Sequence, residues 1–187
     1  MADGTLKVGT ITTSSGSGTI TIGQSGETVT IPSGATINMS SATQTGVGGA
    51  NTPAFQAYQG SASTYGAAVT LITCNTEVFD SNSAYDTSAY RFTPQVAGKY
   101  FFYGQIYIAS PGTNLTMQCR LSKNGSAFAV GDQNSAVNRD QAVVAHGSVD
   151  LNGSSDYVDL RGYNSSSMTT VAGSLYTYFG GFKLIGA

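Results

Sequence analysis

The stretch YFFYGQIYI, residues 100–108, is a run of β-prone residues that is apolar on both of its faces. Side chains alternate between the two faces of a β-strand. The first face carries Tyr100, Phe102, Ile106 and Ile108, and the second carries Phe101, Tyr103 and Tyr107. A strand on a half-solvated sheet would alternate apolar with polar residues. We therefore expect one face to pack in the core and the aromatic face to contact another subunit, since interfaces are enriched in Tyr and Phe. The alternative is an ordinary strand whose second face is covered by a loop.

Three further runs have the same β-prone composition. They are TMQCRLSKNGSAFAVG (116–131), AVVAHGSVDLNGSSDYVDLRGY (142–163) and GSLYTYFGGFKLIG (173–186). Asn124-Gly125 and Asn152-Gly153 are residue pairs typical of tight hairpin turns. No stretch keeps an apolar period of 3.6 residues. The sequence therefore predicts an all-β sandwich or barrel with almost no helix.

The chain changes composition near residue 50. All 19 Tyr and Phe residues lie at or after Phe55, and the preceding stretch TQTGVGGANTP, 43–53, has the composition of a connector. We therefore expect three parts. These are a β-repeat stem that serves as an attachment segment over residues 1–45, a linker over 46–52 and an all-β knob over 53–187.

The N-terminal part contains a recurring four-residue unit. It occurs at 10–13, 19–22, 28–31 and 36–39, at intervals of 9, 9 and 8 residues, with turn-forming residues between the units. The pattern predicts short strands joined by tight turns. The apolar residues of this part are Leu6, Val8, Ile11, Ile20, Ile22, Val29, Ile31, Ile37 and Met39. They are too few for one chain to offset the entropy of ordering the segment, so it needs neighbouring copies or another protein.

We expect two roles for these apolar residues. Ile20, Ile22, Val29 and Ile31 are predicted to lie in the interface of a trimeric stem. Leu6, Val8 and Ile11 are predicted to attach the stem to another surface.

Charge and hydropathy exclude several classes of partner. The net charge is −2, and the 8 Lys and Arg residues form no basic stripe, so we expect no nucleic-acid partner. No secretory signal is visible and no apolar run reaches 18 residues, so we expect synthesis in a cytoplasm and no membrane insertion. Cys119 alternates with Leu115, Met117 and Leu121, which favours a core position; the alternative is a disulfide with Cys74.

Residues suited to catalysis are few. His146 is the only histidine, and no GxSxG motif accompanies it. Asp150, Asp156 and Asp159 are close in sequence and could serve a glycosidase, but Asp is also a common turn residue. We predict no catalytic site.

We also predict no metal site and no cofactor. Calcium stays an open alternative, with five candidate ligands but no DxDxDG loop. These candidates are Asp80, Asp86, Asp132, Asp156 and Asp159.

Residues 77–108, EVFDSNSAYDTSAYRFTPQVAGKYFFYGQIYI, resemble the signature of the C1q globular head, a branch of the tumour necrosis factor-like jelly rolls. The matching pieces within it are Phe79, Tyr85-Asp86, Phe92-Thr93-Pro94 and Gly98-Lys99-Tyr100-Phe101-Phe102. Further pieces occur in family order, one before this stretch at 53–57 and three after it at 121–125, 151–158 and 178–182, so the resemblance covers about residues 53–187. Ser155 departs from the pattern, which usually has Gly before this Asp, and no Gly-X-Y collagen repeat precedes the head.

The resemblance implies a ten-stranded jelly roll that assembles as a homotrimer, with aromatic residues near the threefold axis. It also implies a binding module, not an enzyme. The Gly, Thr and Ile repeats before the head resemble those of bacteriophage fibres and virion decoration proteins.

Together these features predict a homotrimeric bacteriophage virion surface protein, made in the bacterial cytoplasm. We expect it to decorate and cement the capsid, with an exposed knob able to bind host-surface glycans. The alternative is the receptor-binding tip of a tail fibre. A cell-encoded lectin, a spore-surface protein and a glycan hydrolase are further alternatives.

Overall fold

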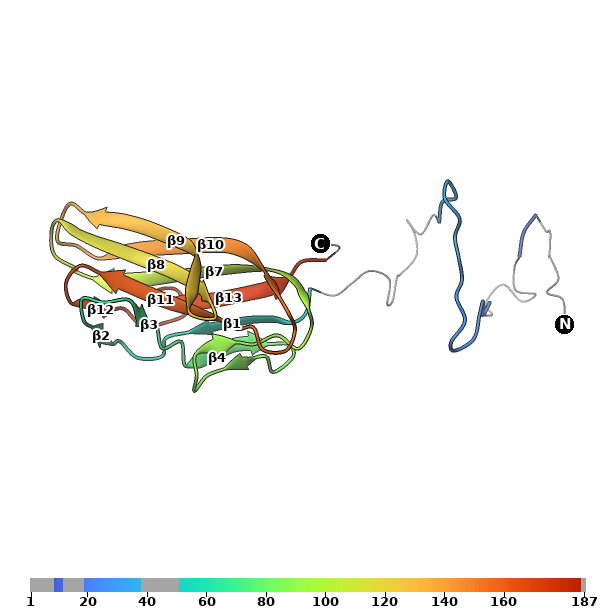
Figure 1. Ribbon diagram of the computed structural model, residues 1–187, viewed down its shortest axis with the longest axis horizontal. Coiled ribbons are helices and arrows are strands. Elements are labelled where there is room, and N and C mark those ends of the chain that lie inside the picture. The colour runs from blue at the N-terminus through green and yellow to red at the C-terminus, as the bar shows by residue number, and fades with distance from the viewer. Residues whose placement is uncertain (1–8, 12–18, 38–50, 186–187) are drawn as a thin grey trace. The chain divides into compact units, whose positions relative to one another are not determined.

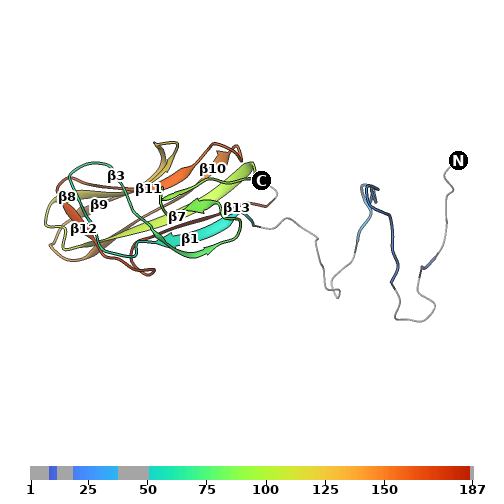
Figure 2. The ribbon, with the colours of Figure 1, turned by 90° about the horizontal axis from the view of Figure 1, so that it is seen from below.

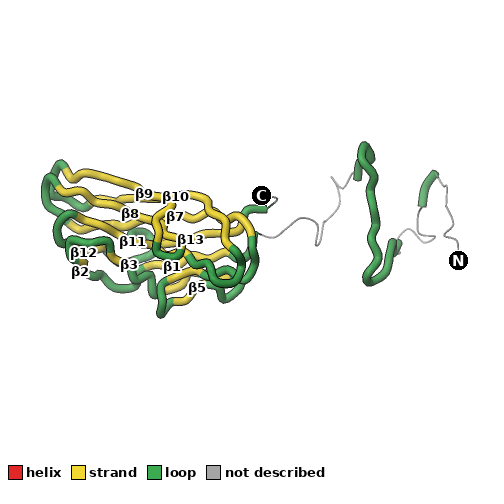
Figure 3. Tube along the Cα trace, in the orientation of Figure 1, coloured by secondary structure: helices red, strands yellow, loops and turns green. Residues whose placement is uncertain are grey.

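The computed structural model describes residues 9–11, 19–37 and 51–185 (Figure 1). The chain divides into two units, Met1–Thr45 and Gly46–Ala187. The second unit, here called the head, contains all the strands of the described residues, and these residues contain no helix (Figure 3). Most of the predicted linker, 46–52, lies outside the described residues, as do Leu6 and Val8.

Thirteen strands occur in the part of the head that the structure describes, residues 51–185. They are β1 (Ala54–Tyr58), β2 (Thr64–Tyr65), β3 (Thr70–Leu71), β4 (Thr76–Asp80), β5 (Tyr85–Asp86), β6 (Arg91–Phe92), β7 (Gly98–Ala109), β8 (Leu115–Lys123), β9 (Ser126–Ser135), β10 (Gln141–Leu151), β11 (Val158–Asn164), β12 (Met168–Thr170) and β13 (Tyr178–Lys183). The expected all-β class is confirmed, but the count of ten strands is not. The difference comes from short paired segments of two or three residues, such as β2, β3 and β12.

The strands form two antiparallel sheets that lie face to face (Figures 1 and 2). Sheet A has the order β2-β12-β7-β13-β1-β4, with β10 also paired to β7. Sheet B has the order β5-β6-β11-β8-β9, with β3 also paired to β11. Strands far apart in the sequence, such as β1 and β13, are therefore neighbours.

The core lies between the two sheets and is rich in aromatic rings. Along β7 every second residue faces it, and the apolar members of this set are fully buried: Tyr100, Phe102, Ile106 and Ile108. This confirms the face that alternation predicts for the core. Phe55 lies at the centre of the rings, with centroids 4.8 Å from Tyr85 and 4.6 Å from Phe92.

The sandwich closes on one side where β9 approaches β10. A Cβ atom at Gly131 would lie 1.7 Å from the carbonyl oxygen of Val144, so only glycine allows the two backbones to meet there. Because β10 belongs to sheet A and β9 to sheet B, this contact joins the two sheets along their edges.

One of the two predicted hairpin turns is confirmed and the other is wrong. Lys123 pairs with Ser126, and Asn124 and Gly125 between them have φ of 51° and 83°, as a two-residue hairpin turn requires. Asn152-Gly153 instead leads from β10 in sheet A to β11 in sheet B. Asn152 does not adopt the positive φ of a two-residue hairpin turn, and the sheet to which β11 belongs is decided by its pairing with distant strands.

Both cysteines are free and fully buried, and Cys119 is a core residue as alternation predicts. Burial raises the pKa of each thiol to about 12. The Cys119 thiol donates to the Gly104 carbonyl oxygen at 3.5 Å.

The N-terminal unit contains two turns but no strand within residues 19–37. The Glu27 amide donates to the Gln24 carbonyl at 3.0 Å, and the Ala35 amide donates to the Pro32 carbonyl at 3.1 Å. The turns predicted at 23–26 and 32–34 are therefore confirmed, whereas residues 19–37 of the single chain form no strand; the first predicted turn, 14–18, and parts of the units at 10–13 and 36–39 lie outside the described residues. A strand needs a neighbour to accept its backbone hydrogen bonds, and none is present for this segment among the described residues.

Candidate functional site

The outer face of sheet A is the most distinctive surface of the head. Pairing places His146 opposite Tyr103, Tyr103 opposite Gly180, and Gly180 opposite Gln56, so one row crosses four strands. Tyr103 alternates with the buried core residues of β7 and therefore points away from the core. It shares this face with Phe101, Gln105 and Tyr107 of the same strand, all half-buried.

Aromatic rings pair across the strands of this face. The ring centroids of Phe101 and Phe182 are 5.7 Å apart, and those of Tyr103 and Tyr178 are 6.2 Å apart. Both distances are typical of favourable aromatic contacts. A Cβ atom at Gly180 would lie 2.5 Å from the Tyr103 ring, so this glycine lets Tyr103 lie over β13.

The loop that precedes β13, residues 171–177, covers one end of the face. Gln105 Nε2 donates to the carbonyl oxygens of Leu175 and Tyr176, at 3.2 and 2.8 Å. Tyr176 packs edge-on against Tyr107, with centroids 5.2 Å apart. The side chain of Leu175 is 79% exposed beside them. The loop therefore covers Tyr107 but leaves the apolar side chain of Leu175 exposed to solvent.

The central part of this face carries no charge. The outward residues of β7 from Phe101 to Ala109 are uncharged, and the ion pair between Lys99 and Asp150 (3.0 Å) lies at the end of the sheet. His146 is exposed and its ring lies 6.3 Å from that of Phe101. Burial, and then the neighbouring Tyr178, raise the pKa of Tyr103. We call this surface, formed by Phe101, Tyr103, Tyr107, Tyr176, Tyr178 and Phe182, the aromatic face.

Sequence reasoning found half of the aromatic face. Phe101, Tyr103 and Tyr107 lie together on it, as expected from alternation along one strand. The sequence did not predict the other three members, Tyr176, Tyr178 and Phe182. The two-residue alternation along a strand shows which face a residue occupies, but not which strand is its neighbour in the sheet. The run LYTYFGGF, 175–182, carries these aromatic residues at alternate positions and was the feature of the sequence that could have indicated them.

The predicted interface residues of the N-terminal unit are exposed in the single chain. Their exposed fractions are 44% for Ile20, 69% for Ile22, 55% for Val29 and 47% for Ile31. Ile11, predicted for attachment, is 58% exposed. Contacts of these residues with other copies or other proteins stay predictions.

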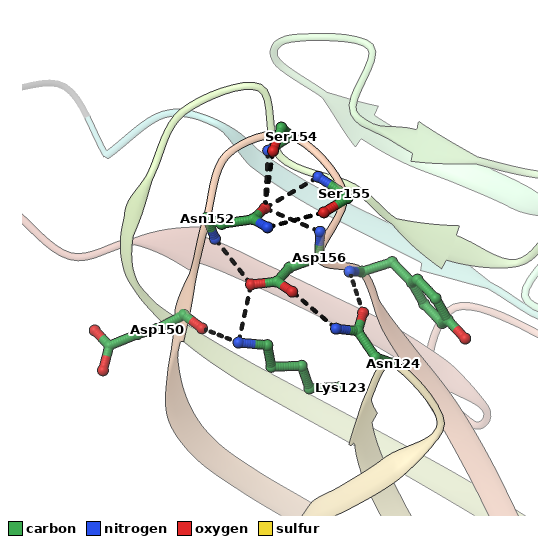
Figure 4. A network of polar contacts seen from close by, with 8 residues as sticks. Lys123, Asn124, Asp150, Asn152, Ser154, Ser155 and Asp156 are labelled. Atoms are coloured by element: carbon green, nitrogen blue, oxygen red, sulfur yellow. Dashed lines mark hydrogen bonds and ion pairs between the residues drawn. The ribbon is translucent and has the colours of Figure 1, made fainter.

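Asp156 lies in a network of polar contacts beside the β8–β9 turn (Figure 4). One carboxylate oxygen pairs with Lys123 Nζ at 2.9 Å and accepts the Asn152 amide at 2.9 Å, while the other accepts Asn124 Nδ2 at 2.8 Å. The hydrogen bonds from Lys123 and Asn124 lower the pKa of Asp156. This carboxylate therefore ties the turn to the β10–β11 loop.

The Asn152 side chain shapes that loop. Its Oδ1 accepts the amides of Ser154, Ser155 and Asp156, each at 3.0 Å. Ser155 is not among the residues with positive φ, so its replacement of the usual glycine causes no backbone strain.

The other carboxylates proposed for glycan hydrolysis are engaged separately. Asp150 pairs with Lys99, and Asp159 with Arg161. Each of the three aspartates thus has its own cation, which argues against a pair of carboxylates poised about one substrate. Within the described ranges, no three His, Cys, Asp or Glu side chains lie close enough to hold a metal ion, so the five calcium candidates do not converge. No helix long and apolar enough to cross a membrane occurs in the described residues.

The two-sheet architecture, closed along β9 and β10, defines a β-sandwich of the jelly-roll class. The C1q domain family matches residues 54–184, so the chain belongs to the C1q domain family.

Solved structures support the same fold. Murine APRIL at pH 5.0 is 13% identical, with a TM-score of 0.58 over 70% of this chain and 98% of that chain. The globular domain of zebrafish complement 1qA protein is 17% identical, with a TM-score of 0.51 over 71% and 97% of the two chains. Eiger TNF from S. frugiperda is 12% identical, with a TM-score of 0.53 over 72% and 93%. No curated protein sequence matches the chain.

Proposed function

We propose that the protein is a non-enzymatic, homotrimeric surface protein of a bacteriophage virion that decorates and cements the capsid. The aromatic face is the observation that best supports a trimer. Its rings lie on a broad sheet surface whose centre has no charge to desolvate, so a neighbouring copy can cover it at little electrostatic cost. A closed threefold arrangement then ends assembly at a discrete particle.

The N-terminal unit supports a role in attachment. Five large aliphatic side chains are exposed between residues 19 and 37, which is unusual for a segment that acts only as a spacer. Three copies side by side, or a capsid surface, would cover Ile and Val faces that one chain leaves in water. The Gly, Thr and Ile repeats that carry these residues are the feature that favours a virion protein.

A receptor-binding tip of a tail fibre is the second candidate. It is favoured by the head, which has a second broad sheet face that the proposed trimer contact does not use. In that case the N-terminal unit would join the head to a fibre instead of a capsid.

Two measurements test the proposal. Light scattering of the full chain should give about three times the 19.2 kDa chain mass, and a monomer would refute the trimer. Immunogold labelling of phage particles with an antibody against the head should place the protein on the capsid. Labelling confined to the tail would favour the fibre tip, and unlabelled particles would remove the virion role.

A further inference from the structure

The outer face of sheet B concentrates arginine. The chain has four arginines, and three of them lie on adjacent strands of this sheet: Arg91 on β6, Arg161 on β11 and Arg120 on β8. The residues that flank them, including Phe92, Leu160 and Leu121, are buried in the core. Alternation therefore directs the arginines away from the core, on the side of the sandwich opposite the aromatic face.

Two of these arginines are direct cross-strand neighbours. Arg161 pairs with Arg120 in the ladder between β11 and β8. Like charges directly opposite each other destabilise a sheet. The two side chains relieve this by leaning along their own strands, Arg161 toward Asp159 and Arg120 toward Gln118.

The positive charge is presented to solvent, whereas its one partner carboxylate is not. Arg161 Nε and Nη2 donate to the two oxygens of Asp159 at 2.8 and 2.9 Å. The side chain of Arg161 is 28% exposed but that of Asp159 only 4%. A molecule arriving at this face therefore meets the guanidinium group and not the carboxylate.

The other two arginines have no carboxylate within 4.0 Å in the part of the chain that the structure describes. Arg120 donates from Nε at 2.8 Å, and from Nη2, to the neutral amide oxygen of Gln118. Gln118 is held in turn by its own donation to Asp132 at 2.6 Å. Arg91 has a buried Nε without an acceptor among the described residues. Arg120 therefore keeps a charge that no carboxylate neutralises at close range, whereas Arg91 lies opposite Asp86 and Asp159 in its two ladders.

Tyrosine rings hold these two guanidinium groups in place. The Cζ atom of Arg91 lies 4.5 Å from the ring centroid of Tyr157, and that of Arg120 lies 5.8 Å from the centroid of Tyr163. Both distances lie within the range of cation–π contacts. Tyr157, Tyr163 and the three arginines thus form a surface of flat cations beside aromatic rings, which we call the Arg–Tyr face.

We propose that the Arg–Tyr face binds an acidic polysaccharide, one whose sugar units carry carboxylates. The guanidinium fork matches a carboxylate with two parallel hydrogen bonds, and the tyrosine rings hold two of the guanidinium groups in place for this contact. Three cations on a chain of net charge −2 are too few to track a nucleic-acid backbone, which makes a discrete acidic sugar the better fit. This inference goes beyond the proposed capsid role: it takes up the glycan binding that the sequence predicts for the knob and gives it a ligand class and a site.

Calorimetry of the full chain with polygalacturonate tests the proposal. We expect binding that disappears when the carboxylates of the polymer are methyl-esterified. Arg91→Ala and Arg120→Ala should each lower the affinity about tenfold, the usual effect of losing a hydrogen bond between charged groups. Arg120→Lys should recover part of the loss, since it restores charge without the fork. Arg139→Ala is the matched control, because Arg139 is exposed in the loop after β9, away from this face.

Several results would overturn the proposal. They are no binding of polygalacturonate, equal binding of its esterified form, or an equal loss in Arg139→Ala. A single-stranded DNA of equal charge that competes equally well would show a general polyanion site and also overturn it. Thermal unfolding of each variant separates lost binding from lost folding. Light scattering on the same samples reports the trimer independently, so failure of the trimer and failure of the Arg–Tyr face are distinguishable.

Discussion

At the scale of single residues, Gly131 allows the backbones of β9 and β10 to approach closely, because it has no side chain. Adding a Cβ there places it 1.7 Å from the Val144 carbonyl oxygen, which is backbone and cannot turn aside. We expect Gly131→Ala to lower the free energy of unfolding by about 3 kcal/mol, the upper range for forced overpacking. Urea denaturation measures this. Gly66→Ala is the control, since nothing lies within 4 Å of its Cβ position, and an equal cost there would refute the steric explanation.

The Asp156 carboxylate makes stability depend on pH in the acid range. Its pKa is lowered below the ordinary value of 3.8 by its hydrogen bonds with Lys123 and Asn124. A lowered folded-state pKa means that the carboxylate stabilises the fold above the ordinary value and stops doing so as pH falls through the lowered one. Asp156→Asn should therefore lower Tm at neutral pH and reduce its dependence on pH below 4.

Asp150→Asn is the matched control for this change. The ion pair of Asp150 with Lys99 is exposed, with 76% of the Asp150 side chain in solvent, so its loss should leave Tm almost unchanged. A Tm profile for Asp156→Asn that follows the wild type across the acid range would contradict the predicted role of Asp156.

The two buried thiols should be chemically silent in the folded protein. The thiolate is the reactive form, and burial raises the pKa of Cys74 and Cys119 to about 12, so both are protonated at pH 8. A chromogenic disulfide reagent should label no thiol in the native protein and both thiols in denaturant. Rapid labelling of the native protein would contradict the buried placement.

At the scale of elements, β7 shows how much the sequence could predict. Its alternation separated the core set, such as Phe102 and Ile106, from the outer set, such as Tyr103, because both follow from the geometry of one strand. The neighbours of β7 could not be read in the same way. Tyr178 joins the aromatic face through pairing between β13 and β7, more than 70 residues apart, as the contact of Gln105 with Tyr176 also shows (separation of 71).

The same limit explains the wrong prediction at Asn152-Gly153 and the lack of strands in residues 19–37 of the single chain. Asn124-Gly125 forms its hairpin because both flanking strands happen to lie in sheet B. Asn152-Gly153 has equally suitable residues but joins two sheets. The β-branched residues of 19–37 favour strands, yet propensity alone supplies no partner for their backbone groups. The Arg–Tyr face was missed because Arg91, Arg120 and Arg161 are scattered in sequence and meet only through strand order.

At the scale of the whole molecule, the head has two outer faces of different chemistry. The aromatic face is neutral at its centre, whereas the Arg–Tyr face presents guanidinium groups. Contact between copies costs least where no charge is desolvated, and recognition of an anion needs charge that stays accessible. The two faces therefore suit different partners. A substitution on one face should abolish the contact of that face and leave the contact of the other intact.

Tyr103→Glu tests this division, because it places a charge at the centre of the aromatic face. We expect the variant to fall from about three times 19.2 kDa to the mass of one chain in light scattering, since burying an unpaired carboxylate between copies costs several kcal/mol. Val137→Glu is the control. Val137 is 49% exposed in the loop after β9, so the same charge there should leave the trimer intact. A Tyr103→Glu protein that remains trimeric would move the interface away from the aromatic face, and the apolar residues of 19–37 would then have to supply it.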